Sequence, residues 1–366
     1  MVYYIPPLFY LLICAAFLKN KKIPLFVISI YLVLLSGFRF GIGTDYNSYL
    51  RIFNDLPTIQ TLRYVNFFDT EVSLLLFKII IDIFALPEYS IFLFISAVSF
   101  FGIKLVMDKA KIDNRYLFVY LYYCFLYFNL NFNLILTGAS IPFVALALIS
   151  KNISERVKYF LIAYSFHITT LIFVPLIFLI DKKINKVVII FALVLSIIAS
   201  EMNFILKLMV ILSSIMPGAF GQLLTYYSEL YSNSGGYGYG VGFFVWLFIY
   251  VFLLINKNKL CITKDDKSIN LVLNGMLFLL LAYILFNGMP VLLQRVTSLF
   301  MFSYFYYLSN FWKFNIFRRD YITLLLYVTF IVTIGIYTFY KVTHGAGIIQ
   351  EYQFLPYYSV FHEGAL

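Results

Sequence analysis

Residues 19–49 read KNKK (19–22), IPLFVISIYLVLLSGF (23–38) and RFGIGTDYNSY (39–49). A basic cluster comes first, an uninterrupted apolar run follows it, and a glycine-rich polar stretch comes last. A basic flank on one side of an apolar helix is typical of the cytoplasmic side of membrane proteins. This stretch therefore predicts a membrane helix over residues 23–38 that leaves the membrane at Arg39.

The composition extends this interpretation to the whole chain. Of the 366 residues, 63% are hydrophobic and 12% are charged, and the mean hydropathy is +0.91. A soluble domain carries roughly twice that charged fraction. We therefore expect an all-α fold: a polytopic transmembrane helix bundle, forming a single integral membrane domain over residues 1–366 with about 11 to 12 membrane-embedded segments.

Lysine and arginine residues gather in short clusters between the apolar runs. The clusters are 19–22, 104–115, 151–158, 182–186, 257–267 and 313–319, and they hold 20 of the 27 basic residues. Because basic loops stay in the cytoplasm, all of these clusters are expected on that side, and the net charge of +10 requires no nucleic-acid partner. The outward-facing parts are then a first periplasmic loop over 39–89, a second over 201–240 and a C-terminal tail over 341–366.

The apolar runs between the clusters predict the helices. These cover residues 2–18, 23–38, 90–107, 116–128, 134–149, 187–200, 241–255, 269–286, 296–312 and 321–340, with Asn129–Asn133 as an outer turn. As a single span, either of two further segments would put basic clusters on the wrong side. We therefore interpret 72–86 as an interfacial helix in which Lys78 and Asp82 pair one turn apart. We interpret 159–180 as a broken, hairpin-like pair of half-helices that turns near His167.

The stretch from Gly37 to Tyr49 carries the most chemical information. Its three glycines allow a tight backbone, and Arg39 and Asp45 are held near the membrane boundary. Arg39 either extends its charge to the interface from a helix end or binds a ligand, and Asp45 either caps the next helix or acts in chemistry. His167 likewise either bonds a backbone carbonyl freed at the helix break or takes part in a reaction. The three cysteines are far apart and indicate neither a disulfide nor a metal site.

The motif R-x-G-x-G-T-D-Y-x-x-Y over Arg39–Tyr49 resembles the signature of the EpsG-like and Wzy-type polymerases of bacterial surface polysaccharide. Phe160–Leu171, Gln294–Arg295 and Phe354–Tyr357 fit the same family in the same order, so the resemblance covers nearly the whole chain. One departure lies at residues 133–139, which lack the arginine that this family commonly has there.

The resemblance implies a glycosyltransferase of the hexosyltransferase type, in the bacterial inner membrane, with its active site facing the periplasm. It would transfer a growing glycan from undecaprenyl diphosphate onto a lipid-linked oligosaccharide repeat unit, without a metal or other cofactor. The architecture is similar to that of GT-C enzymes, which place an acidic catalytic residue in the first outer loop. Expected partners are the lipid bilayer and a chain-length regulator and flippase of the same pathway. A lipid-linked oligosaccharide flippase and an O-antigen ligase are the alternatives.

The resemblance also assigns roles to residues of this chain. Asp45 is expected to take the proton of the acceptor hydroxyl, with His167 as the second candidate. Arg39 and Arg295 are expected to bind the diphosphate and to stabilise its developing charge. Supporting roles are expected for Gly43, Tyr49, Gln294 and Tyr357. We expect Asp45, Arg39 and Arg295 to converge on one outward-facing cavity.

Overall fold

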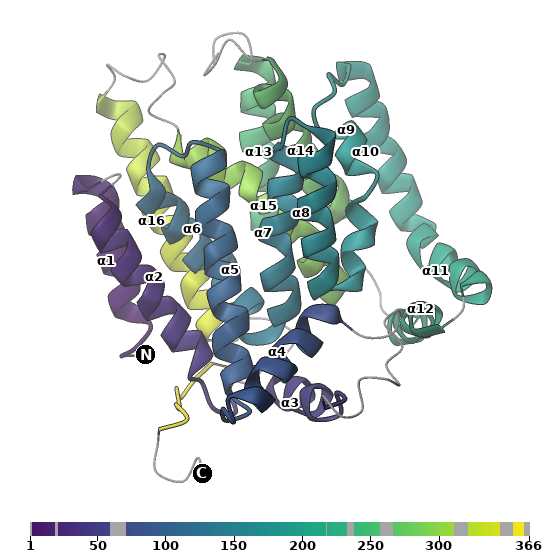
Figure 1. Ribbon diagram of the computed structural model, residues 1–366. Coiled ribbons are helices and arrows are strands. Elements are labelled where there is room, and N and C mark those ends of the chain that lie inside the picture. Colours follow the sequence, from purple (N-terminus) through teal and green to yellow (C-terminus); the bar gives the residue numbers. More distant parts are fainter. Residues whose placement is uncertain are drawn as a thin grey trace. The chain divides into compact units, whose positions relative to one another are not determined.

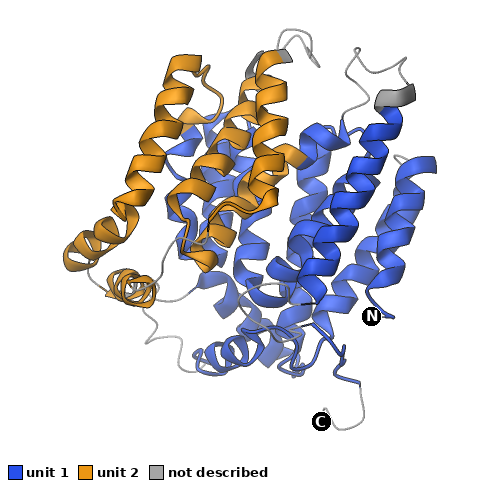
Figure 2. Cartoon of the chain, turned by 180° about the vertical axis from the view of Figure 1, so that it is seen from behind, with its two compact units in different colours: residues 1–177, 305–366 blue, residues 178–304 orange. Residues whose placement is uncertain are grey.

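The chain folds as an all-α helical bundle, as predicted (Figure 1). The computed structural model describes residues 2–18, 21–58, 71–216, 218–232, 238–256, 266–310, 321–344 and 354–361. It divides into two compact units (Figure 2): unit 1 comprises Met1–Ile177 and Phe305–Leu366, and unit 2 comprises Phe178–Tyr304. The expectation of one integral membrane domain stays a prediction.

The helices follow one another with short connections. They are α1 (Ile5–Phe17), α2 (Lys22–Gly37), α3 (Tyr46–Asn54), α4 (Val72–Ile83), α5 (Ser90–Lys109), α6 (Arg115–Tyr122), α7 (Ile135–Ile149), α8 (Ile153–Phe166), α9 (Leu176–Leu179), α10 (Lys186–Glu201), α11 (Phe204–Ile215), α12 (Gly218–Tyr231), α13 (Val241–Asn256), α14 (Asp266–Leu285), α15 (Pro290–Ser309) and α16 (Tyr321–Thr343). Between them lie two π-helices, η2 (Tyr123–Tyr127) and η3 (Asn129–Asn133), and a 3₁₀-helix, η4 (Ile168–Phe173).

Several of these helices are suited to a bilayer. Ser90–Lys109 and Leu324–Thr343 are long and apolar enough to cross a membrane, and α10 with α11, bent by 72°, is a third candidate if the pair is one span. Further apolar helices of 10–17 residues accompany them. Large apolar side chains lie exposed on the helix flanks; on α10, Val187 is 70% and Phe191 64% exposed. Such surfaces are stable against lipid rather than water. The chain is therefore a membrane protein, and the number of its membrane-embedded segments stays a prediction.

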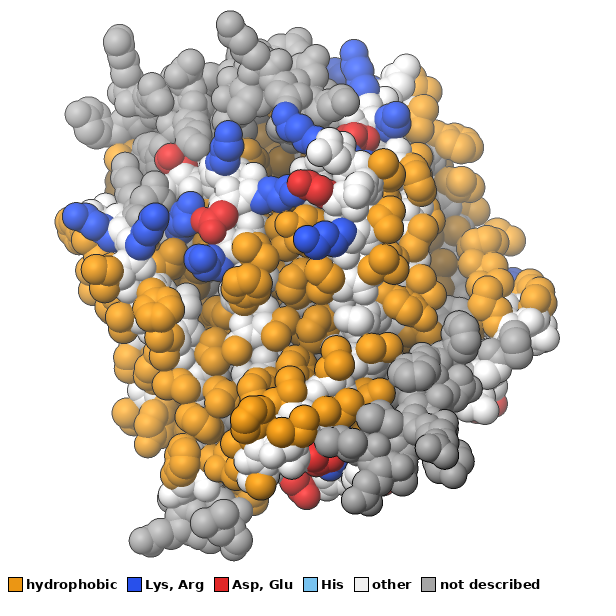
Figure 3. Space-filling view, viewed as in Figure 1, with side chains coloured by type: hydrophobic (Ala, Val, Ile, Leu, Met, Phe, Trp, Pro, Cys, Tyr) orange, Lys and Arg blue, Asp and Glu red, His pale blue; other side chains and the backbone are white. Residues whose placement is uncertain are grey.

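The first three basic clusters lie at one end of unit 1. Tyr116 Oη at the start of α6 donates a hydrogen bond to the backbone oxygen of Lys21, 2.7 Å away. Lys109 at the end of α5 forms an ion pair with Glu155 at the start of α8, and this contact holds the pKa of Glu155 below its usual value. Figure 3 shows basic side chains gathered above hydrophobic flanks on this face. We call this the basic end; it fits a shared cytoplasmic location, which stays a prediction.

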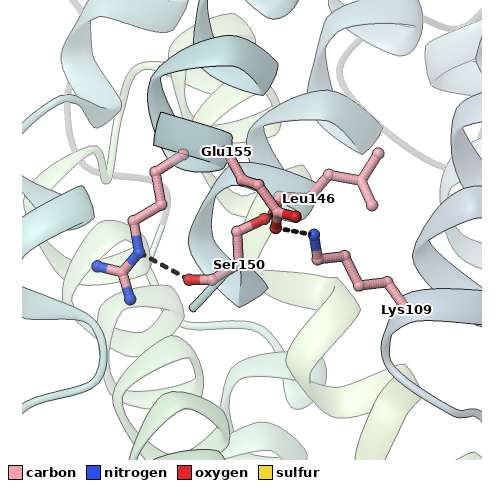
Figure 4. A network of polar contacts seen from close by, with 5 residues as sticks. Lys109, Leu146, Ser150 and Glu155 are labelled. Atoms are coloured by element: carbon pink, nitrogen blue, oxygen red, sulfur yellow. Dashed lines mark hydrogen bonds and ion pairs between the residues drawn. The ribbon is translucent and has the colours of Figure 1, made fainter. Parts of the chain in front are cut away.

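The segment after α7 is broken as the sequence predicts. His167 has an extended backbone, with φ −157° and ψ 123°, and separates α8 from η4. Arg156 near the start of α8 donates to the backbone oxygens of Ser150, at 2.8 Å, and of Ile177 (Figure 4 shows the surroundings of Ser150). Because Arg156 and Ile177 lie on opposite sides of His167 in sequence, the chain turns back on itself there. The predicted hairpin of half-helices is confirmed.

The predicted outer turn at Asn129–Asn133 is wrong, because these residues form η3. The asparagines suggested a solvated turn, but Asn131 is only 2% exposed. Its side-chain oxygen accepts a hydrogen bond from Tyr122 Oη at 3.0 Å. The amide is thus satisfied inside the protein, which removes the cost of burying it.

Other differences concern helix boundaries. The segments predicted as loops contain α3, α11 and α12, and α15 begins at Pro290 rather than at residue 296. Proline is well suited to a first helical turn because its missing N–H would have no partner there. The predicted pair of Lys78 and Asp82 on α4 is confirmed, with 3.2 Å between Nζ and Oδ1. The interfacial position of α4 stays a prediction.

The packing of α7 makes a testable demand on Gly138. A Cβ atom at Gly138 would lie 2.2 Å from the backbone oxygen of Leu130, whereas one at Gly242 in α13 would meet nothing within 4 Å. We expect Gly138→Ala to destabilise the protein by about 1–3 kcal/mol through overpacking. Gly242→Ala should be neutral or stabilising by up to about 1 kcal/mol, because alanine favours helix. Thermal unfolding in detergent measures both, and an equal effect of the two substitutions would contradict this packing.

Candidate functional site

Arg39 is completely buried in unit 1, with an exposed fraction of 0%. Its Nε donates to the backbone oxygen of Ile42 at 3.1 Å, and Nη1 donates to that of Ser36 at 2.6 Å. Nη1 also donates to the oxygen of Asn131 at 2.9 Å, and Nη2 to that of Phe132 at 3.3 Å. One guanidinium therefore ties together the end of α2, the following turn and the end of η3. We call these contacts the Arg39 network.

Aromatic rings enclose the same guanidinium. Its Cζ lies 4.4 Å from the centre of the Phe92 ring, 5.2 Å from that of Phe132 and 5.8 Å from that of Tyr46. Tyr46 and Phe92 also stack on each other, with 4.6 Å between ring centres. Burial lowers the pKa of Arg39 to about 10, so the group stays cationic at neutral pH and attracts the ring faces.

The turn over residues 39–45, the glycine turn, needs its glycines. Gly43 has φ +97°, a conformation that other residues rarely adopt, and a Cβ atom there would lie 2.3 Å from the oxygen of Phe132. The next residue, Thr44, donates its backbone N–H to the side-chain oxygen of Asn133 at 3.0 Å. The predicted supporting role of Gly43 has a physical basis here: the turn packs directly against the end of η3.

The segment 354–361 near the C-terminus lies against the glycine turn. The backbone N–H of Phe40 donates to the oxygen of Tyr358, and that of Val360 donates to the oxygen of Phe38, both at 2.9 Å. Tyr357 Oη donates to the backbone oxygen of Leu35 at 2.9 Å. Tyr357 therefore supports the end of α2, which is a structural contact at the position that the sequence predicted.

Asp45 directly precedes α3, at its N-cap position. Its backbone oxygen accepts a hydrogen bond from the N–H of Tyr49 at 2.9 Å, but its carboxylate makes no capping bond. Its side chain is half-buried, and no ion pair joins it to Arg39, whose hydrogen bonds go to backbone oxygens. In the part of the chain that the structure describes, the Asp45 carboxylate has no hydrogen-bond partner. The capping alternative for Asp45 is therefore wrong.

His167 is bonded to a residue that the sequence did not single out. Its Nδ1 lies 3.0 Å from Oε1 of Glu71, the residue that precedes α4. Its Nε2 is buried and has no hydrogen-bond partner. An acidic residue just before an apolar helix was a visible signal for a helix start, but nothing in the sequence links Glu71 to a residue so distant along the chain.

Asp45, Glu71 and His167 lie at the end of unit 1 that is opposite the basic end. The glycine turn follows the end of α2 that lies away from Lys22. Phe77 of α4 stacks on Phe94 near the start of α5 at 5.6 Å, and Lys78 of α4 lies over Phe53 of α3 at 4.9 Å. In Figure 1, α3 and α4 lie together at this end. We call it the turn end.

Arg295 belongs to unit 2, on α15. Its Cζ lies 5.9 Å from the ring centre of Tyr227 on α12, and its Nε is buried without a hydrogen-bond partner among the described residues. Gln294 beside it is exposed. The backbone before α15 is irregular, with Gly288 at φ +96°. The expected convergence of Arg295 with Asp45 and Arg39 stays a prediction.

The donors of Arg39 and Arg295 differ in availability. Of the five N–H groups of Arg39, four are committed to backbone oxygens, whereas the Nε of Arg295 has no such commitment. The direct diphosphate contact expected of Arg39 stays a prediction. Among the described residues, no group of three or more His, Cys, Asp or Glu side chains is placed to hold a metal ion.

Comparison with protein families adds to this geometry. The model of the EpsG family matches residues 22–359. The chain belongs to the EpsG family. This EpsG family member is a membrane protein of a family associated with exopolysaccharide biosynthesis. No curated protein and no solved structure matches the chain.

The Arg39 network predicts a stability effect. Arg39→Lys keeps the charge but cannot reach the four carbonyl contacts of the planar guanidinium. We expect it to destabilise the folded protein by about 3–5 kcal/mol, the usual cost of breaking a buried charge network. Arg51→Lys, at an exposed position on α3, is the matched control and should lie within about 0.5 kcal/mol of wild type. Denaturation in mild detergent compares them, and an Arg39→Lys protein as stable as Arg51→Lys would refute the network.

Proposed function

We propose that this EpsG family member is a polysaccharide polymerase. It transfers a growing glycan from undecaprenyl diphosphate to a hydroxyl of a lipid-linked oligosaccharide repeat unit, at the periplasmic face of the inner membrane. The turn end of unit 1 is the proposed reaction face and the basic end the cytoplasmic one, because basic loops stay in the cytoplasm.

The observation that carries this proposal is the gathering of proton-accepting groups at the turn end. Asp45 has a half-buried carboxylate without a hydrogen-bond partner among the described residues, and His167 has a bare ring nitrogen bonded through its other side to Glu71. Glycosyl transfer to a hydroxyl needs a group that takes the hydroxyl proton. Asp45 and His167 are the two candidates for that role.

The leaving group sets the second requirement. A lipid diphosphate departs with an additional negative charge on its bridging oxygen, and a fixed cation lowers the energy of that charge. Arg295 fits this role because its buried Nε has no other partner, and an arginine fork can bind phosphate through two N–H groups. Arg39 keeps the glycine turn in place and adds positive potential. The diphosphate of the donor is itself a good leaving group, so the proposed reaction proceeds without a metal.

A double substitution tests the proposed reaction. Asp45→Asn combined with His167→Gln removes both proton acceptors, and we expect polymer formation to fall by about 10²–10⁴-fold, the usual contribution of a general base. Single repeat units should still reach the outer leaflet. The measurement is the glycan ladder from cells that carry the protein as their sole polymerase, with protein abundance checked on a blot.

The matched control is Asp55→Asn with His344→Gln, which changes the same residue types at positions outside the proposed site. It should give a wild-type ladder. A full ladder from the first double variant would refute the proposal. Repeat units trapped on the inner leaflet would instead indicate a flippase.

A further inference from the structure

His167 is a buried imidazole with one satisfied and one unsatisfied nitrogen. The side chain is 12% exposed, Nδ1 lies 3.0 Å from Oε1 of Glu71, and Nε2 has no hydrogen-bond partner. A buried polar atom without a partner costs about 1–3 kcal/mol. Native proteins keep few such atoms, and they often do so at functional sites.

The helix break does not explain this arrangement. The backbone N–H of His167 donates to the oxygen of Ala163 at 3.2 Å, and its carbonyl accepts from the N–H of Thr170 at 3.1 Å and from Thr170 Oγ1 at 2.8 Å. The backbone on both sides of the break is therefore satisfied without the ring. The alternative that His167 serves to bond a freed carbonyl is wrong, because the ring bonds Glu71.

The partner of Nδ1 fixes the chemistry of Nε2. An ionised carboxylate only accepts hydrogen bonds, so Nδ1 carries the proton in the neutral ring. Nε2 is then left with its lone pair. A carboxylate that orients an imidazole and stabilises the imidazolium is the arrangement by which enzymes activate histidine as a base.

The packing holds both partners in place. Phe77 of α4 packs on Phe166, the neighbour of His167, with ring centres 6.3 Å apart. Phe166 in turn stacks on Phe143 of α7 at 6.1 Å. The side chains of Glu71 and His167 are 26% and 12% exposed. These contacts restrict the rotation of the imidazole, which a positioned base requires.

We infer that Glu71 is a positioning residue and that His167 Nε2, rather than Asp45, takes the proton of the acceptor sugar hydroxyl. This inference rests on the proposed function. The hydroxyl oxygen bonds to the anomeric carbon of the donor glycan, and the bond from that carbon to the diphosphate oxygen breaks. Its electron pair leaves on the lipid diphosphate. The hydroxyl proton moves to Nε2, which makes the ring an imidazolium held by the Glu71 carboxylate, and water later accepts that proton.

The experiment uses the full-length protein in liposomes with a synthetic repeat unit linked to undecaprenyl diphosphate. Polymer length and initial rates give kcat and KM. We expect His167→Gln to lower kcat by about 10²–10⁴-fold with little change in KM, because the base acts in the transition state. Glu71→Gln should lower kcat by about tenfold or more and Glu71→Asp should restore part of it, because only aspartate returns the charge.

Two further arms separate chemistry from structure. His167→Gly should regain activity when imidazole is added, a response that a purely packing role would not give. Glu88→Gln, which changes a glutamate bonded to Asn54 on α3 at 3.1 Å, is the matched control and should keep wild-type kinetics.

The outcomes are distinguishable. Polymer from wild type together with near-normal kcat in His167→Gln and Glu71→Gln would overturn the inference while the proposed function stands. Loss of polymer in Asp45→Asn alone would then identify Asp45 as the base. No polymer from the wild-type protein would overturn the proposed function and this inference with it.

Discussion

A buried guanidinium without hydrogen bonds would be very costly, and this constraint organises the turn end of unit 1. Arg39 avoids the cost by donating to carbonyls that helix geometry leaves without partners. Ser36 lies in the last turn of α2, and Asn131 and Phe132 lie at the end of η3. A cation at two helix C-termini also lies in the negative field of their backbone dipoles. The charge and the two helix ends therefore satisfy each other.

The position of the candidate site follows from this interaction. With Arg39 held inside, the chain must pass around it through the glycine turn, and Gly43 allows the backbone to approach η3 closely. Asp45 and α3 follow directly, and α4 packs beside α3 through Lys78 and Phe53. Glu71 at the start of α4 then meets His167 at the helix break. Groups that are distant along the chain are thus brought to one end of unit 1, away from the basic clusters.

The apolar runs and the basic clusters predicted most helices because hydropathy acts locally. The break at His167 was also predictable, since the positions of the charges ruled out a single span there. The burial of Asn131 was not, because the partners Tyr122 and Arg39 that satisfy this residue become visible only in three dimensions. The helices of 201–240 were missed for a different reason. Their apolar residues were noticed, but a large loop satisfied the expected topology equally well.

The candidate site was predicted in part. The motif of the glycine turn identified Arg39, Gly43 and Asp45, yet the sequence could not show that Arg39 is buried with its donors on backbone oxygens. Glu71 was missed because its pairing with His167 depends on how α4 packs against α8. Sequence motifs indicate which residue types the chemistry needs, whereas partners across helices depend on packing.

The most direct test of the central claim is hydrogen exchange of the glycine turn in lipid nanodiscs. Phe40 and Thr44 donate their amides to Tyr358 and to Asn133, so both should exchange slowly in the wild-type protein. In Arg39→Ala, the account predicts that residues 40–44 exchange on the order of 100-fold faster while the interior of α5 keeps its protection. Unchanged protection of the glycine turn in Arg39→Ala would contradict the claim that Arg39 holds this end of the molecule together.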